Sequence, residues 1–280
     1  MLGKTVVVTG GTSGIGEVAA LRLAAMGARI VLIARDKART DATLARLAAA
    51  NPAAPHTAHR ADLSSLAEMK RVAGEVAGVE PKIDVLINNA GAVFTTRQES
   101  MDGLEMTFAV NHMAYFVVTN ILLPNLKATP GARIVSTAST AHRAGKIDFA
   151  DLQLRKGYST FRAYGNSKLM NILFTRELAR RLGDRGVTAN CLHPGGVNTR
   201  FGTNNSGFVA GLFKVAMGIF GISPEEGAKT IIHLASSPDV ATISGEYFYK
   251  CKIIDPAPAG QDDAAAKKLW EVSEKIAGVG

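Results

Sequence analysis

The sequence predicts an α/β fold in which a doubly wound, seven-stranded parallel sheet is flanked by helices on both faces. Short apolar runs rich in β-branched residues alternate with longer helical stretches, which is typical of strands buried on both faces. A glycine-rich turn follows the first such run at 4–9. Polar or small residues also follow the later strands, where ligands bind in sheets of this kind. Because no Pro/Gly/Ser-rich linker divides the 280 residues, we expect residues 1–280 to form a single domain.

The elements follow from the same patterns in chain order. Strands are expected at 4–9, 29–34, 56–60, 83–88, 132–138, 187–193 and 246–249. Helices are expected at 15–26, 37–50, 64–77, 100–127, 161–182, 224–236 and 262–277. The alanine-rich stretch 42–50 is a helix by propensity. Right-handed crossovers between parallel strands then give the doubly wound arrangement.

The turn at 10–16 is a candidate phosphate-binding loop. It reads Gly-Gly-Thr-Ser-Gly-Ile-Gly and joins the first strand directly to the first helix. Glycine permits a tight turn and a close approach of backbone to phosphate. The helix N-terminus offers unpaired N–H groups and a positive dipole end. An ordinary glycine-rich turn is the alternative, but the strand and helix around it favour nucleotide binding.

A second candidate site lies on the helix predicted at 161–182. Tyr164 and Lys168 are four residues apart, so both side chains can lie on one helical face. A nearby cation lowers the pKa of a phenol, which makes the pair a plausible proton-transfer device. Tyr158 is a weaker rival, because Arg162 rather than lysine stands four residues after it. A solvated surface pair is the alternative.

Taken together, these segments resemble the classical short-chain dehydrogenase/reductase family, whose fold is a Rossmann-type domain. Residues 9–16 resemble its T-G-x-x-x-G-I-G turn, and 88–91 resemble its N-N-A-G segment. Residues 194–199 resemble its P-G-x-V-x-T segment. Within the family, the H-P-G-x-V pattern at 193–197 and the stretches 223–228 and 244–248 are most similar to the retinol dehydrogenase-like branch.

The resemblance implies reversible hydride transfer between a nicotinamide and a carbonyl or alcohol group. Asn111, Ser139, Tyr164 and Lys168 stand where the family places its catalytic residues. Tyr164 would exchange the proton with the substrate oxygen, and Ser139 would position that oxygen. Lys168 would lower the pKa of Tyr164 and bind the nicotinamide ribose, while Asn111 would hold a water. From the local sequence alone, Ser136 competes with Ser139, and Asn111 could instead kink or cap its helix.

We expect the cofactor to be NADP(H), with NAD less favoured. The second strand ends in Ala34-Arg35, so the acidic residue typical of NAD-binding proteins is missing there. The Arg35 guanidinium could pair with a 2′-phosphate. Asp36 could approach a ribose or cap the next helix. The expected cofactor-binding residues are Gly10, Thr12, Ser13, Gly14, Ile15, Gly16, Arg35, Asp62, Leu63, Asn89, Ala90, Gly91, Tyr164, Lys168, Pro194, Gly195, Val197 and Thr199.

The apolar, glycine-broken segment that follows the P-G motif is expected to be a substrate lid at 197–222. Core packing, a dimer contact and a shallow membrane-surface segment are the alternatives. The substrate is expected to be a small, lipophilic carbonyl compound or alcohol. A non-catalytic NADP(H)-binding sensor or scaffold on the same fold is the alternative function.

The composition argues against a nucleic-acid-binding, disulfide-bonded or metal-binding protein. A net charge of +8 could indicate nucleic-acid binding, but the basic residues are scattered and no aromatic stacking array accompanies them. Cys191 and Cys251 give no disulfide framework and no metal site, which favours a reduced setting. We expect a cytoplasmic protein with no signal peptide and no transmembrane segment. By analogy with the family it could form a homodimer or homotetramer through its long helices.

Overall fold

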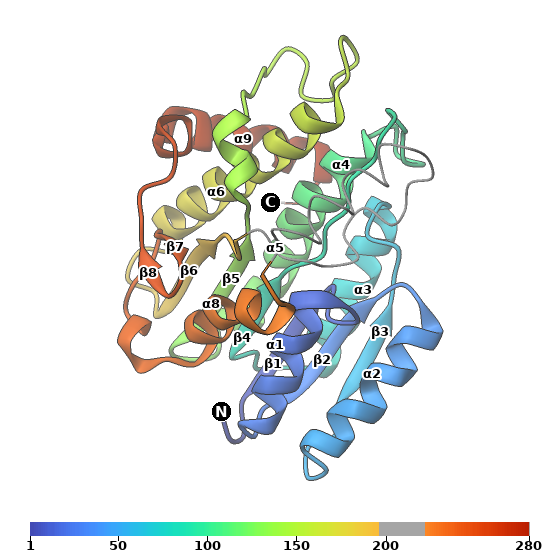
Figure 1. Cartoon of the computed structure of the whole chain (residues 1–280), viewed down its shortest axis with the longest axis vertical. Helices are drawn as coiled ribbons and strands as arrows, with labels where there is room; N and C mark the ends of the chain where they lie inside the picture. Colours follow the sequence, from blue (N-terminus) through green and yellow to red (C-terminus); the bar gives the residue numbers. More distant parts are fainter. Residues whose placement is uncertain (196–221, 280) are drawn as a thin grey trace.

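The computed structural model of the chain describes residues 1–195 and 222–279. Its sheet has eight strands in the spatial order β3-β2-β1-β4-β5-β6-β7-β8 (Figure 1). The strands are β1 (Thr5–Thr9), β2 (Arg29–Ala34), β3 (Thr57–Arg60), β4 (Val85–Asn88), β5 (Ala132–Thr137), β6 (Val187–Leu192), β7 (Tyr247–Tyr249) and β8 (Lys252–Ile253). Strands β1 to β7 pair in parallel, whereas β8 pairs antiparallel with β7. The predicted doubly wound α/β fold is therefore confirmed, with one strand more than predicted.

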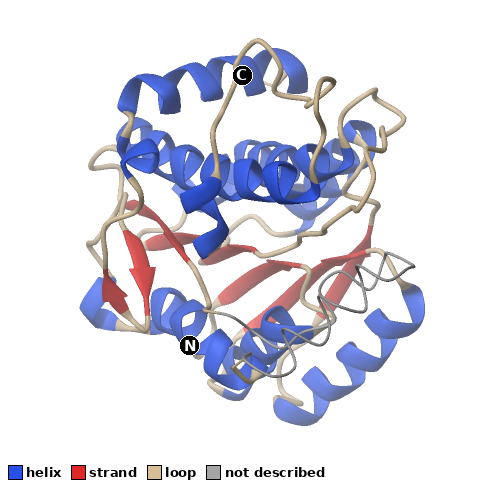
Figure 2. Ribbon diagram, turned by 45° about the horizontal axis from the view of Figure 1, so that its top comes forward, coloured by secondary structure: helices blue, strands red, loops and turns tan. Residues whose placement is uncertain are grey.

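Helices cover both faces of this sheet (Figure 2). The α-helices are α1 (Gly14–Ala25), α2 (Lys37–Ala50), α3 (Leu66–Val79), α4 (Met106–Phe108), α5 (Ala114–Lys127), α6 (Thr160–Leu182), α8 (Pro224–Ser236) and α9 (Asp263–Ala277). A π-helical segment, η1 (Ala109–Met113), joins α4 to α5, and short 3-10 turns form η2 (Thr140–Ala144), η3 (Pro238–Val240) and η4 (Pro258–Gln261). One core lies between the sheet and α3, α5, α6 and α9, and the other lies between the sheet and α1, α2 and α8.

The first strand shows how the sequence pattern builds these two cores. Val7 points into the core beneath α3, α5 and α6, whereas Val6 and Val8 point into the core beneath α1 and α8. All three side chains are fully buried. A run of consecutive β-branched residues therefore fits this central strand, because successive side chains alternate between two buried faces.

Two predicted elements differ from the observed ones. The helix expected at 100–127 begins only at Met106, because residues 100–105 form a turn that is closed by a bridge between Glu99 and Glu105. The Glu105 carboxylate then accepts hydrogen bonds from the N–H groups of Thr107 and Phe108, both at 2.8 Å. The extra strand β8 was missed because two residues carry no readable periodicity.

One apolar helical stretch has the length and composition of a membrane span. It covers Met106–Lys127, and 72% of its apolar window is buried inside the protein. It belongs to the core beneath α3 and α6, and a buried core helix has the same composition as a membrane span. The expectation of no transmembrane segment stays a prediction, as does the cytoplasmic location.

Helix α9 packs over α6 through an aromatic cluster. The Trp270 ring is stacked on Phe174 of α6, at an interplanar angle of 8° and a centroid distance of 5.8 Å. It also meets Phe116 of α5 edge-on, with centroids 4.9 Å apart, and the Arg181 guanidinium lies 4.5 Å from its centroid. A dimer contact at this part of α6 would require α9 to move. The expected dimer or tetramer stays a prediction.

We predict that Trp270→Ala lowers the free energy of unfolding by about 3–5 kcal/mol, because it empties a closely packed aromatic site. Urea unfolding followed by circular dichroism measures the change. Lys267→Ala, on the exposed face of the same helix, is the matched control and should change the unfolding free energy by less than about 0.5 kcal/mol. Equal effects of the two substitutions would contradict the packing role of α9.

Candidate active site

The candidate site lies along the carboxyl edge of the sheet. The glycine turn follows β1, Arg35 follows β2, Asp62 follows β3 and Asn89 follows β4. Chain order reverses between β1 and β4, which are neighbours in the sheet. A crevice at such a reversal is the usual ligand site of open α/β sheets. The residues singled out in the sequence are thus brought to one edge.

Thr9 and Asn89 fasten the glycine turn to the loop after β4. The Thr9 hydroxyl accepts hydrogen bonds from the backbone N–H of Asn89 at 3.0 Å and of Ala90 at 3.1 Å. The Asn89 amide donates to the carbonyl oxygen of Gly10 at 3.1 Å. A Cβ atom on Gly16 would lie 2.3 Å from the Asn89 amide nitrogen, and one on Gly10 would lie 2.7 Å from the Ala90 Cα. Glycine is therefore required at both positions.

The same turn fits the pyrophosphate of a dinucleotide. Helix α1 begins at Gly14, and the Ser13 side chain makes no capping hydrogen bond to it within the described part of the chain. The first N–H groups of α1 are therefore not satisfied by their own cap residue. Thr12, Ser13 and Ile15 are partly or fully exposed at the turn. An anion can reach the positive end of the helix dipole here.

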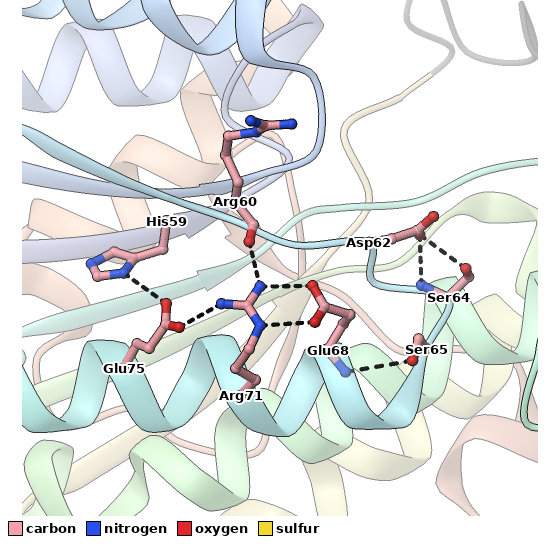
Figure 3. Close-up of polar contacts among 8 residues, drawn as sticks. All are labelled: His59, Arg60, Asp62, Ser64, Ser65, Glu68, Arg71 and Glu75. Atoms are coloured by element: carbon pink, nitrogen blue, oxygen red, sulfur yellow. Dashed lines mark hydrogen bonds and ion pairs between the residues drawn. The ribbon is translucent and has the colours of Figure 1, made fainter.

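The turns after β2 and β3 carry the residues that are expected to meet the adenine end of the cofactor. The Arg35 guanidinium is exposed and lies 3.9 Å from a carboxylate oxygen of Asp62. The other Asp62 oxygen accepts hydrogen bonds from the backbone N–H of Ser64 at 3.0 Å and from its hydroxyl at 2.9 Å (Figure 3). Leu63, between them, is buried. Asp36 caps α2 by accepting from the N–H of Arg39 at 2.9 Å, which favours the capping alternative.

A network of charged side chains on α3 contacts the end of β3 (Figure 3). The Arg71 guanidinium, on α3, donates to the carbonyl oxygen of Arg60 at 2.6 Å and to the carboxylates of Glu68 and Glu75. Glu75 in turn lies 3.5 Å from the His59 ring. Exposed ion pairs of this kind stabilise a protein only weakly, so the network mainly fixes how the end of β3 meets α3.

Ser139 and Tyr164 meet at the end of β5. The Ser139 side chain is close enough to the Tyr164 phenol to lower its pKa, and the Ser139 Oγ accepts a hydrogen bond from the N–H of Ala141 at 3.2 Å. The rival Ser136 lies fully buried within β5, and its hydroxyl has no hydrogen-bond partner among the described residues. The rival Tyr158 donates its hydroxyl to the carbonyl oxygen of Phe94 at 2.8 Å. The geometry therefore favours Ser139 and Tyr164.

Close backbone packing holds these two residues together. The η2 segment, which follows Ser139, lies against the start of α6, which carries Tyr164. A Cβ atom on Gly145 would lie 2.7 Å from the carbonyl oxygen of Gly165, and one on Gly165 would lie 3.0 Å from that of Ala141. Both glycines are therefore part of the site, although neither was singled out in the sequence. The glycine directly after Tyr164 was the signal available.

Lys168 is buried close to Tyr164. Its ammonium nitrogen donates to the carbonyl oxygen of Thr137 at 3.0 Å and lies 5.6 Å from the Tyr164 ring centroid and 5.9 Å from that of Tyr115. Burial lowers the pKa of Lys168 to about 7. Burial likewise raises the pKa of Tyr164 to about 12, although its hydrogen bond with Ser139 acts in the opposite direction.

The expectation that Lys168 lowers the pKa of Tyr164 stays a prediction, because in the protein chain alone the burial of Tyr164 raises this pKa. Removal from water disfavours the charged form of both groups, the phenolate and the ammonium. The sequence could place the two residues on one helical face, but it could not show how deeply that face is buried.

Asn111 lies in the π-helical segment and joins three parts of the site. Its carbonyl oxygen accepts from the N–H of Ala92 at 2.7 Å, and its amide donates to the carbonyl oxygen of Ala92 and to the Ser167 hydroxyl, both at 3.0 Å. Ser167 donates to the carbonyl oxygen of Tyr164 at 2.8 Å. These contacts join separate segments and do not cap the helix of Asn111, and its role in holding a water stays a prediction.

The end of β6 completes the described part of the site. His193 stacks on Tyr249 with ring centroids 4.1 Å apart, and burial lowers its pKa to about 4, so its imidazole is neutral near pH 7. Its Nδ1 atom accepts from the N–H of Gly195 at 3.2 Å, just after Pro194. Val197, Thr199 and the lid expected at 197–222 lie outside the described residues, apart from Ile222.

Known proteins resemble this chain over its whole length. The short chain dehydrogenase family matches residues 4–207. Retinol dehydrogenase 14 of Mus musculus is 41% identical, with 100% of this chain and 87% of that protein aligned. Retinol dehydrogenase 13 of Homo sapiens is 40% identical, with 99% and 85% aligned. Among solved structures, a short chain dehydrogenase from Burkholderia cenocepacia J2315 in complex with NADP is 29% identical, with a TM-score of 0.70 over 88% of this chain and 96% of that one.

These matches confirm the resemblance to the family and to its retinol dehydrogenase-like branch. They also agree with the fold. The chain belongs to the short chain dehydrogenase family of oxidoreductases.

Proposed function

We propose that this protein transfers a hydride between NADP(H) and a carbonyl or alcohol group of a small, lipophilic substrate, with Tyr164 as the general acid and base. The observation that carries this proposal is the grouping of Ser139, Tyr164 and Lys168: the Ser139 side chain acts to lower the pKa of Tyr164, and the buried Lys168 amine lies 5.6 Å from the Tyr164 ring centroid. A proton donor and a positioning hydroxyl at the same edge as a dinucleotide-type turn are what carbonyl reduction requires.

The protein supplies position and the proton. When bound, the nicotinamide supplies the hydride in reduction and accepts it in oxidation. The Tyr164 hydroxyl donates its proton to the carbonyl oxygen in reduction and regains it in oxidation. The Ser139 hydroxyl, whose oxygen caps η2 by accepting from the N–H of Ala141, hydrogen-bonds the same substrate oxygen and fixes its orientation.

Lys168 is suited to hold the nicotinamide ribose hydroxyls and to pass a proton toward Tyr164. The Lys168 amine lies 5.6 Å from the centroid of the Tyr164 ring. Burial lowers the pKa of Lys168 to about 7, so the amine can gain or lose a proton near neutral pH. Asn111 supports the start of α6: its amide donates to the Ser167 hydroxyl, which donates to the carbonyl oxygen of Tyr164. We propose that water held near Asn111 completes the path for the proton.

The cofactor preference is proposed from the end of β2. An exposed guanidinium at Arg35 can meet a 2′-phosphate, and Asp36 is engaged as a helix cap. The related structure in complex with NADP supports the same choice. The relatives named retinol dehydrogenase support a lipophilic alcohol or carbonyl compound as substrate. A cytoplasmic location remains part of the proposal.

We predict that Tyr164→Phe lowers turnover by about 10²–10⁴-fold, because the ring remains but the proton is lost. The decrease of NADPH absorbance with a panel of lipophilic aldehydes and ketones measures turnover. NADPH binding, followed by fluorescence, is the control and should change little. Unaltered turnover in the variant would exclude Tyr164 as the acid. Tight NADPH binding by the wild type without turnover on any substrate would favour the non-catalytic sensor.

We predict that Arg35→Ala weakens NADPH binding by about 10–100-fold and leaves NADH binding nearly unchanged, since only NADPH carries the 2′-phosphate that the guanidinium can bind. Calorimetric titration of the two cofactors measures the ratio. Lys267→Ala removes the same charge at a distant exposed position and is the matched control. A parallel loss for both cofactors would show that Arg35 does not select between them.

The buried amine predicts how stability depends on pH. Since the pKa of Lys168 is about 7 when folded and 10.5 ordinarily, the unfolded chain binds more protons between these values. Stability of the cofactor-free protein therefore gains a contribution that rises from pH 7 toward pH 10, by at most about 1.4 kcal/mol per pH unit. Urea unfolding at pH 7 and 9.5 tests this, and Lys168→Met should abolish the contribution. The same pH dependence in both proteins would mean that the amine is not desolvated.

A further inference from the structure

His142 occupies a buried position between the site and the C-terminal part of the chain. It belongs to η2, three residues after Ser139. Its Nδ1 atom lies 2.7 Å from the carbonyl oxygen of Ser139, and its Nε2 atom lies 3.0 Å from the backbone nitrogen of Ala257, just before η4. One imidazole thus connects the proposed catalytic serine to a segment more than a hundred residues later in the chain.

The two partners determine where the ring carries its proton. A carbonyl oxygen can only accept a hydrogen bond, so Nδ1 must donate to Ser139. A backbone N–H can only donate, so Nε2 must accept from Ala257 without a proton of its own. Only the neutral ring protonated on Nδ1 satisfies both contacts. The other neutral tautomer satisfies neither, and the protonated ring would set an N–H against the N–H of Ala257.

The surroundings of the ring are consistent with this neutral form. Tyr247 of β7 meets it edge-on, with centroids 5.2 Å apart at 76°, and its hydroxyl lies 3.4 Å from Nδ1. His193, after β6, and Arg143, on the same segment, are the other titratable groups that act on this region. Burial, with a smaller contribution from the positive charge of Arg143, lowers the pKa of His142, whereas its contact with Ser139 raises it.

We infer that His142 is a positioning residue for the proposed reaction: through Nδ1 it fixes the backbone of Ser139, and so the angle at which the serine hydroxyl meets Tyr164 and the substrate oxygen. The inference rests on the proposed function. Ser139 precedes η2, so its side chain follows the backbone at this point. A misplacement of a positioning group by about 1 Å can cost about 10²-fold in rate.

Two substitutions separate the two contacts of the ring. The Asn amide nitrogen can take the place of Nδ1 but does not reach Ala257, whereas the longer Gln side chain reaches Ala257 but does not reproduce the donor to Ser139. We expect His142→Gln to lower kcat by about tenfold or more, with NADPH affinity unchanged, and His142→Asn to recover most of that loss. His233→Gln, on α8, is the matched control.

The order of these two variants is the decisive result. If His142 supported the fold alone, kcat would follow the thermal midpoint, and the two variants would fall together or Asn would fall further. Equal kcat values for wild type and His142→Gln would also overturn the inference. Tyr164→Phe, assayed in parallel, separates the two failures: if it abolishes turnover while His142→Gln is fully active, the proposed function stands and the role of His142 does not.

A readout without turnover tests the same claim in the cofactor-free protein. Nitrogen-15 NMR of the labelled histidines should show His142 as the neutral tautomer with its proton on Nδ1 at pH 7. A proton on Nε2 in that spectrum, or a fully protonated ring, would contradict the contacts to Ser139 and Ala257. The His142→Gln spectrum assigns the signal, because it lacks that one ring.

Discussion

The site depends on the direct contact of two backbones. Helix α6 supplies Tyr164 and Lys168, and the segment after β5 supplies Ser139, but these elements are far apart in the sequence. They meet because Gly145 and Gly165 allow backbone atoms to approach to a distance that any Cβ atom would prevent. The N–H of Lys146, which donates to the Asn166 side chain at 2.8 Å, adds a hydrogen bond across the same contact. The absence of side chains at these two glycines thus helps determine the separation of Ser139 and Tyr164.

A second constraint is the carbonyl oxygen of Thr137, which ends β5. Lys168 at 3.0 Å, the Asn171 amide at 3.2 Å and the Tyr115 hydroxyl at 3.5 Å all donate to this one oxygen. A buried amine needs an acceptor, and this carbonyl provides it without adding a negative charge. The Lys168 amine is therefore fixed near the Tyr164 ring by a neutral acceptor, without a carboxylate to favour its charged form. The burial of both side chains is what lowers the pKa of Lys168 and raises that of Tyr164.

The sequence predicted the features that depend on local pattern. The strands and most helices lie within a few residues of the expected ranges. Apolar runs such as Val6–Val8 predict strands that are buried on both faces, and these residues are buried. Strand ends also predicted which polar residues share an edge. Features that depend on tertiary packing were not predictable: they include the π-helical segment η1 around Asn111, the contact of His142 with Ala257, and the depth at which Lys168 is buried.

The glycine turn illustrates how far a motif can support a function. Gly10 and Gly16 belong to the turn that is proposed to bind phosphate, but both also lie against the loop after β4, where an added Cβ atom would meet Ala90 or Asn89. Folding of the protein therefore requires these glycines whether or not a cofactor binds. Loss of activity on substituting them would combine two causes. The Arg35 side chain is exposed and lies no closer than 3.9 Å to the Asp62 carboxylate, so the proposed cofactor recognition can be tested apart from folding at Arg35 but not at the turn.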